Sequence, residues 1–145
     1  MNPERLRKVA DAIELSGRFK YSSWAEKLDN ECVSFSTIDE LRGVGTLTNC
    51  GTTGCIAGWA ASLAIEEGFV AVGHYDRRLN YSVSAFAEAY LELDSEQGDT
   101  LFLGRAMQYA GLYPEDVDTE DILDRATAVE AAKLLRMVAD GEVEL

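Results

Sequence analysis

The chain has 145 residues and a net charge of −13, with 47% hydrophobic and 27% charged side chains. That composition is ordinary for a globular protein and excludes wholesale disorder, and the length suits one domain, residues 1–145. The strong negative charge disfavours direct binding to nucleic acid and adhesion to anionic membranes.

The first predicted helix covers residues 3–16. Asn2 can cap it, Pro3 suits its first position and Gly17 ends it. Its apolar side chains recur on one face at helical spacing, at Leu6, Val9, Ala10 and Ile13. Ser36 or Thr37 then begins a short helix that runs through Leu41, and Thr37 and Glu40 match a capping box. A glycine- and threonine-rich loop follows at 43–54.

The segment 55–66 is the predicted central helix. Its side chains are apolar or very small on every face, which is typical of a helix buried on most sides. Thr52, Thr53 or Gly54 would cap its first turn. The side chains expected in the core around this helix are Trp24, Cys50, Cys55 and Trp59.

Residues 69–73 are the best strand candidate, because they are partly β-branched and bracketed by glycines, and they would pair with residues 45–48. Helical segments are then predicted at 82–93, 95–104 and 107–112, followed by an acidic connector at 113–119 and a short helix at 122–125. Asp118 or Thr119 would cap that short helix. The last helix, 128–140, begins with a capping box at Thr127 and Glu130.

These elements predict a mainly α fold. We expect a single compact helical domain in which helices 3–16, 82–93 and 128–140 pack around the buried helix 55–66. The segments 45–48 and 69–73 leave room for a minor two-stranded β element beside the helices.

The negative charge is concentrated in the C-terminal part of the chain. Residues 88–145 contain 15 acidic and 4 basic side chains, so they supply −11 of the total −13. Part of this excess is an acidic run that does not follow EF-hand spacing, formed by Glu115, Asp116, Asp118, Glu120 and Asp121. Such a run would attract a basic partner protein, whereas the simpler interpretation is a solvated face that keeps the domain soluble.

The run 49–60 reads Asn-Cys-Gly-Thr-Thr-Gly-Cys-Ile-Ala-Gly-Trp-Ala. Together with Trp24 upstream and the ending at 127–143, it resembles a group of small uncharacterised proteins of phages and actinobacteria. The resemblance covers about residues 20–145; it implies a phage or actinobacterial setting and supplies no mechanism. Members of that group often carry His where this chain has Trp59.

Cys55 at a helix start is a candidate nucleophile, because a helix N-terminus lowers the pKa of a thiol. The base of such a cysteine-dependent hydrolase would be His74, the only histidine, with Asp76 to orient it. The segment faintly resembles the papain-type entry to a helix, although papain-like enzymes place their histidine about 130 residues downstream. The apolar surroundings favour burial of the thiol, which opposes this alternative.

A metal site is the other possibility that the cysteines raise. Cys32, Cys50, Cys55 and His74 would give a Cys3His set, but Cys50 and Cys55 are spaced more widely than a zinc knuckle. The simpler interpretation is that the cysteines are small hydrophobic side chains at a tight junction. With no export signal and an odd number of cysteines, we expect reduced thiols, a cytoplasmic protein and no cofactor.

The sequence therefore favours a small acidic, non-enzymatic protein of phage type that acts by protein–protein interaction. The surface that would carry this interaction contains Glu115, Asp116, Asp118 and Asp121. A homodimer is a further way in which such a chain could associate.

Overall fold

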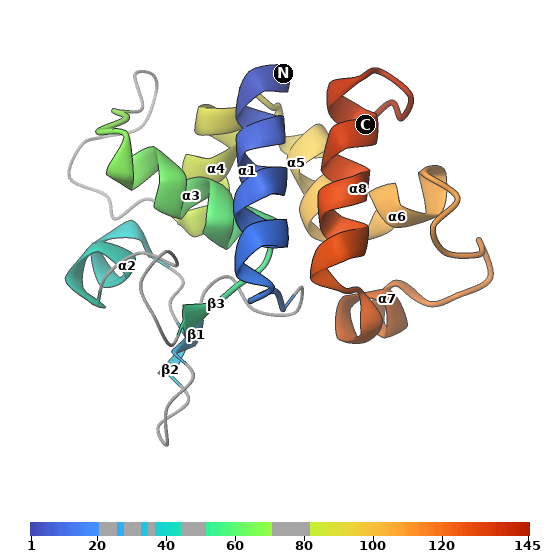
Figure 1. Cartoon of the computed structure of the whole chain (residues 1–145), viewed down its shortest axis with the longest axis horizontal. Helices are drawn as coiled ribbons and strands as arrows, with labels where there is room; N and C mark the ends of the chain where they lie inside the picture. Colours follow the sequence, from blue (N-terminus) through green and yellow to red (C-terminus); the bar gives the residue numbers. More distant parts are fainter. Residues whose placement is uncertain (21–25, 28–32, 35–36, 45–51, 71–81) are drawn as a thin grey trace.

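The computed structural model describes residues 1–20, 26–27, 33–34, 37–44, 52–70 and 82–145, and within them the fold is mainly helical and compact, as predicted. Figure 1 shows α1 standing between α3 on one side and α8 on the other. The helices are α1 Pro3–Ser16, α2 Ile38–Val44, α3 Ile56–Glu66, α4 Val83–Leu91, α5 Ser95–Phe102, α6 Arg105–Tyr109, α7 Thr119–Arg125 and α8 Ala128–Ala139.

Most helix starts follow the predicted capping residues. The Asn2 side chain accepts a hydrogen bond from the Arg5 backbone N–H at 3.2 Å, and the Asp118 side chain accepts one from the Glu120 N–H at 3.0 Å. Reciprocal bonds join Thr37 to Glu40 at the start of α2 and Thr127 to Glu130 at the start of α8. Each of these bonds satisfies an amide that the first turn would otherwise leave unpaired.

The start of α3 differs from the prediction. Cys55 occupies the N-cap position with extended backbone, and the backbone N–H groups of Ala57 and Gly58 interact with its sulfur, which is a weak acceptor. The predicted caps Thr52, Thr53 and Gly54 lie too early in the chain, because α3 begins at Ile56 and its N-cap is the residue directly before it. A sulfur atom is a weaker cap than a hydroxyl or carboxylate oxygen, and burial supports the helix, since Ala57, Trp59, Ala60 and Ala64 are at most 1% exposed.

The described residues also contain a very small sheet, of which β1 (Glu26–Lys27) is the middle strand. It pairs antiparallel with β2 (Val33–Ser34) on one side and with β3 (Thr52–Thr53) on the other. The sequence predicted other strands, at 45–48 and 69–73. Residues 45–48 and 71–73 lie outside the described residues. Phe69 and Val70 are described and are not in a strand.

Phe69 instead packs edge-on against two rings of α4. Its ring centroid lies 5.7 Å from that of Phe86 and 5.4 Å from that of Tyr90. The guanidinium of Arg5 lies 4.7 Å from the Tyr90 ring centroid and donates a 2.7 Å hydrogen bond to the Tyr90 carbonyl oxygen. Phe69, three residues after the end of α3, therefore packs against the core rather than in a strand.

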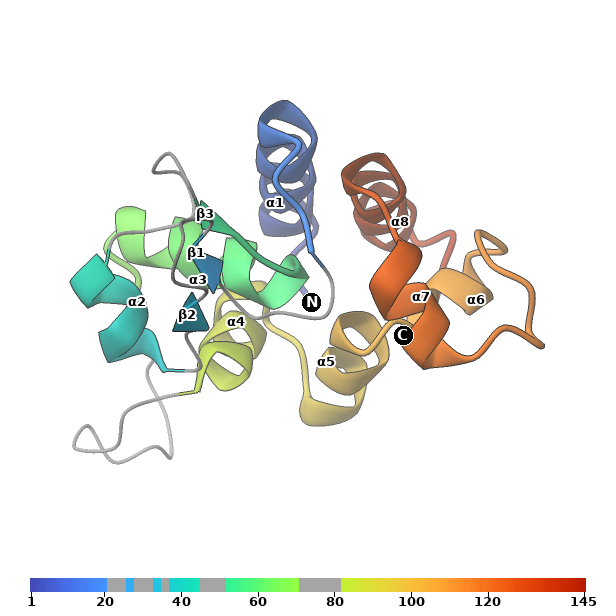
Figure 2. The ribbon, with the colours of Figure 1, turned by 90° about the horizontal axis from the view of Figure 1, so that it is seen from below.

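Helix α1 connects the two sides of the molecule. It contacts α3 and α4 on one side and packs along α8 on the other, an arrangement that Figures 1 and 2 show from two directions. The prediction that α8 packs around α3 is wrong in this respect, since the main neighbours of α8 are α1 and, less extensively, α6. The apolar stripe of α8 indicated that a partner exists but not which helix it is.

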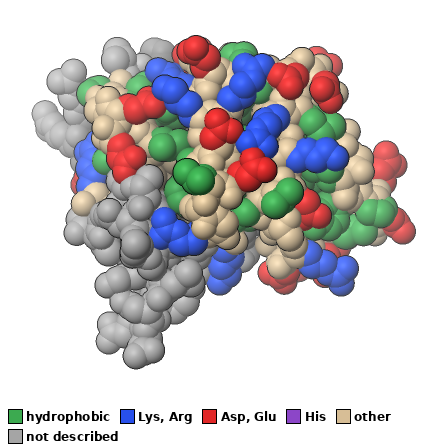
Figure 3. Space-filling model, in the orientation of Figure 1, with side chains coloured by type: hydrophobic (Ala, Val, Ile, Leu, Met, Phe, Trp, Pro, Cys, Tyr) green, Lys and Arg blue, Asp and Glu red, His purple; other side chains and the backbone are tan. Residues whose placement is uncertain are grey.

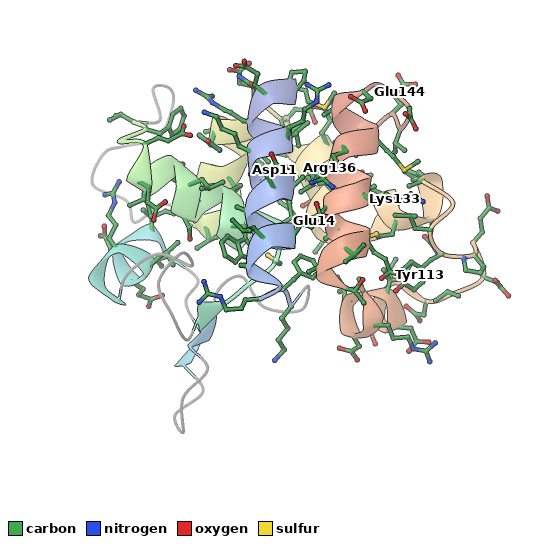
Figure 4. All side chains as sticks on the ribbon, viewed as in Figure 1. Asp11, Glu14, Tyr113, Lys133, Arg136 and Glu144 are labelled. Carbon is green, nitrogen blue, oxygen red and sulfur yellow. The ribbon has the colours of Figure 1, made fainter. Side chains whose placement is uncertain are left out.

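Ion pairs join α1 to α8 at the surface of this contact. The Arg136 guanidinium donates to Asp11 at 2.8 Å and also to Glu14, and Figure 4 shows these three side chains together between the two helices. Farther along, Arg7 donates to Asp140 at 2.5 Å. The five side chains are at least partly exposed, so these pairs orient the helices more than they stabilise them.

Replacing Arg136 with Ala should lower the free energy of unfolding by about 1 kcal/mol or less, because exposed ion pairs contribute only that much. Urea denaturation at low and high salt measures the effect, and the difference from the wild type should shrink as salt screens the charges. Lys133, exposed on the same helix, has no ion pair among the described residues. Lys133→Ala is therefore the matched control, and an equal, salt-independent loss in both variants would contradict the prediction.

Candidate functional site

The candidate nucleophile Cys55 lies inside the hydrophobic core. It is 1% exposed and belongs to the same buried cluster as Trp59, whose indole N–H donates to the Arg18 carbonyl oxygen at 3.0 Å. Burial raises the pKa of the Cys55 thiol to about 11, although hydrogen bonds from the backbone of Gly58 and Ala57 oppose this rise. The thiol is therefore protonated at neutral pH.

A buried, protonated thiol is a poor nucleophile, because the reacting species is the thiolate. Cys55 also lacks access to solvent and so to any substrate of ordinary size. The other two residues of the hydrolase hypothesis, His74 and Asp76, lie outside the described residues. What the structure describes of this site disfavours nucleophilic catalysis by Cys55.

We predict that native Cys55 resists alkylation. A rise of its pKa from 9.0 to about 11 lowers the thiolate fraction near neutral pH about a hundredfold, and burial slows the reagent further. Iodoacetamide labelling followed by peptide mass spectrometry would measure Cys55 separately from Cys32 and Cys50. The urea-unfolded chain, which should label rapidly at all three cysteines, is the control. Fast labelling of Cys55 in the folded protein would contradict the prediction.

The metal hypothesis depends on residues that the structure does not describe. Cys32, Cys50 and His74 lie outside the described residues, as does the predicted core residue Trp24. Within the described part of the chain, no group of three or more His, Cys, Asp or Glu side chains is arranged to hold a metal ion.

The acidic surface, formed by Glu115, Asp116, Asp118, Glu120 and Asp121, lies on the connector between α6 and α7 and on the first turn of α7. All five side chains are exposed. Figure 3 shows acidic groups at the right-hand edge of the molecule, where Figure 1 places this connector. The structure therefore brings the sequence-predicted interaction residues together at one end of the fold.

A glutamine holds the backbone of this connector in place. The side-chain amide of Gln108, on α6, donates to the carbonyl oxygen of Val117 at 2.8 Å and lies 3.3 to 3.4 Å from those of Glu115 and Pro114. Nothing in the sequence around Gln108 indicates this role, because the bonds run from a side chain to the backbone six to nine residues later. The sequence prediction missed this residue.

The other end of the connector is tied to α8. The Tyr113 hydroxyl donates to Glu130 Oε2 at 3.1 Å, and the same carboxylate receives the backbone N–H of Thr127 at 2.9 Å. The proximity of Glu130 and the burial of Tyr113 raise the pKa of the Tyr113 hydroxyl, burial being the larger cause. One carboxylate thus caps α8 and fixes the start of the acidic connector.

The acidic surface differs from the acidic groups around α1 in having no ion pair among the described residues. Around α1, the carboxylates are paired: Glu92 with Arg5, Asp140 with Arg7 and Glu67 with Lys8. Figure 3 shows this as an intermixed distribution of acidic and basic side chains over α1 and α8. Arg125 lies four residues after Asp121 on α7, but among the described residues no ion pair involves a member of the acidic surface, so the surface keeps an excess of negative charge.

A second acidic location is unsuited to binding. An open pocket of about 510 Å3 is lined by Asp11, Glu14 and the exposed Leu15 at the α1 surface. Both of its carboxylates are already paired with Arg136. A basic ligand there would have to compete with that arginine.

Comparisons with protein-family models, curated proteins and solved structures found no match to this chain. Within the described residues, every helix is too short or too polar to span a lipid bilayer. The argument for function therefore depends on the geometry and charge of the acidic surface.

Replacing Gln108 with Met, which has a similar length and no donor, should loosen the connector. We expect amide hydrogen exchange of residues 115–118 to accelerate several-fold, because the Val117 carbonyl loses its 2.8 Å bond. The amides of α1 in the same sample are the internal control, and their exchange should not change. Unaltered exchange in the connector would show that Gln108 does not hold it.

Proposed function

We propose that this protein binds a basic partner protein through its acidic surface and has no catalytic role of its own. The observation that carries the proposal is the group of five exposed carboxylates without ion pairs among the described residues, on a backbone that Gln108 holds. The resemblance to small phage and actinobacterial proteins suggests the host cytoplasm as the setting.

Two physical arguments support a protein partner. Like charges close together raise the energy of the free surface, and a basic partner relieves that repulsion on binding. The bonds from Gln108 and Tyr113 also mean that little ordering of the connector backbone is required when the partner binds. A purely solvating face needs neither a common location nor an ordered backbone.

We predict that changing Glu115, Asp116 and Asp121 to Lys abolishes partner capture. The measurement is affinity capture from a host lysate with immobilised wild-type and variant protein, quantified for each captured protein at two ionic strengths. We expect a captured basic protein whose recovery falls at least tenfold with the variant and also falls as salt increases, because screening weakens an electrostatic contact.

The matched control changes Glu96, Glu142 and Glu144 to Lys, which alters the net charge equally at exposed positions outside the acidic surface. Figure 4 shows Glu144 at the opposite end of α8 from Tyr113, where the acidic connector begins. Capture should survive in this control. Equal loss in both variants would mean that total charge is responsible, and unaltered capture by the first variant would refute the proposal.

A further inference from the structure

Glu88 lies at the junction of α4 and α5, where the two helices approach closely. A methyl group at Gly98 of α5 would lie 2.5 Å from Glu88 Oε1 and 2.7 Å from its Cγ, distances that real side chains essentially never show. Only a glycine at position 98 therefore lets α5 pack against the Glu88 side chain. An open pocket of about 300 Å3 adjoins this contact, with Glu88, Asp94 and Ser95 among its lining residues.

The charged groups that face Glu88 from α5 are both acidic. Asp94 is the N-cap of α5 and accepts a hydrogen bond from the Gln97 N–H at 2.9 Å, so its carboxylate is held in place. Asp99 is on the first turns of the same helix. Neither α4 nor α5 contains a lysine or arginine, and no ion pair of Glu88 is found among the described residues.

The other elements packed on α4 direct their charges elsewhere. Arg5 of α1 and Glu67, at the end of α3, both bond to Tyr90, and Arg42 of α2 lies 6.0 Å from the Phe86 ring. Phe86 and Tyr90 are the positions two residues before and after Glu88, so each lies about 200° around the helix from it. Among the residues that the structure describes, the basic groups near α4 therefore act on the far side of the helix from Glu88.

We propose that the junction of α4 and α5 is a pH-sensitive latch: ionised Glu88 loosens α5 from α4, and protonated Glu88 holds the two helices together. An ionised carboxylate here is partly removed from water and repelled by Asp94 and Asp99. A protonated one can pack on Gly98 without that repulsion and gains a donor.

The direction of the pH effect follows from the pKa of Glu88. Partial burial, then Asp99 and Asp94, raise this pKa above the ordinary glutamate value of 4.5. The folded state therefore binds the proton more tightly than the unfolded state does. The latch gains stability as the pH falls through the raised pKa, and the gain is complete below 4.5.

Amide hydrogen exchange tests the latch. In the wild type, protection of α5 and of the Leu93 amide, which donates to the Glu88 carbonyl oxygen at 2.9 Å, should rise several-fold between about pH 7 and pH 4.5, after correction for intrinsic exchange. Glu88→Gln, which cannot ionise, should show the high protection at both pH values. Glu96→Gln, an exposed carboxylate on α5, should keep the wild-type rise.

A second variant tests the geometry. Gly98→Ala places a methyl group where the Glu88 carboxylate lies, so it should displace that side chain and remove the pH-dependent rise. The proposal is overturned if protection in the wild type and in Glu88→Gln changes in parallel with pH. It is equally overturned if the carboxyl carbon of Glu88, followed by NMR, titrates at the ordinary glutamate value.

Discussion

The fold depends on the burial of α1 between two sets of helices. Leu6, Val9, Ala10 and Ile13 form an apolar stripe on one face of α1 and are fully buried. α3 and α4 cover one side and α8 covers the other, which brings the two ends of the chain together. The small residues of α3 allow the close approach that this arrangement needs.

This arrangement of helices also decides which charges are neutralised. Three of the basic residues on α1, Arg5, Arg7 and Lys8, pair with carboxylates from the ends of α4, α8 and α3, and Arg136 pairs back to α1. The packing of α1 thus pairs four basic side chains of the described residues with carboxylates. The five carboxylates of the acidic surface have no ion pair among the described residues. The acidic surface is in this sense a consequence of how the core is assembled.

The sequence predicted what depends on neighbouring residues. The bounds of α1, the capping boxes at Thr37 and Thr127 and the burial of α3 all follow from patterns within a few positions of each other. It did not predict contacts between distant segments: the packing of α8 on α1, the side chain of Gln108 across the connector, or Phe69 in the core. Those contacts depend on which helix faces meet in three dimensions. An apolar stripe or a single polar residue in the sequence does not identify the residues that it will contact.

The same distinction explains the outcome for the two candidate sites. Position at a helix start and burial act in opposite directions on the thiol of Cys55, and only the structure shows that burial prevails, with a pKa of about 11. For the acidic surface, the sequence already gave the charge, and the structure adds that the carboxylates share one location on a backbone held at both ends. A site that depends on summed charge is therefore easier to read from sequence than one that depends on the environment of a single atom.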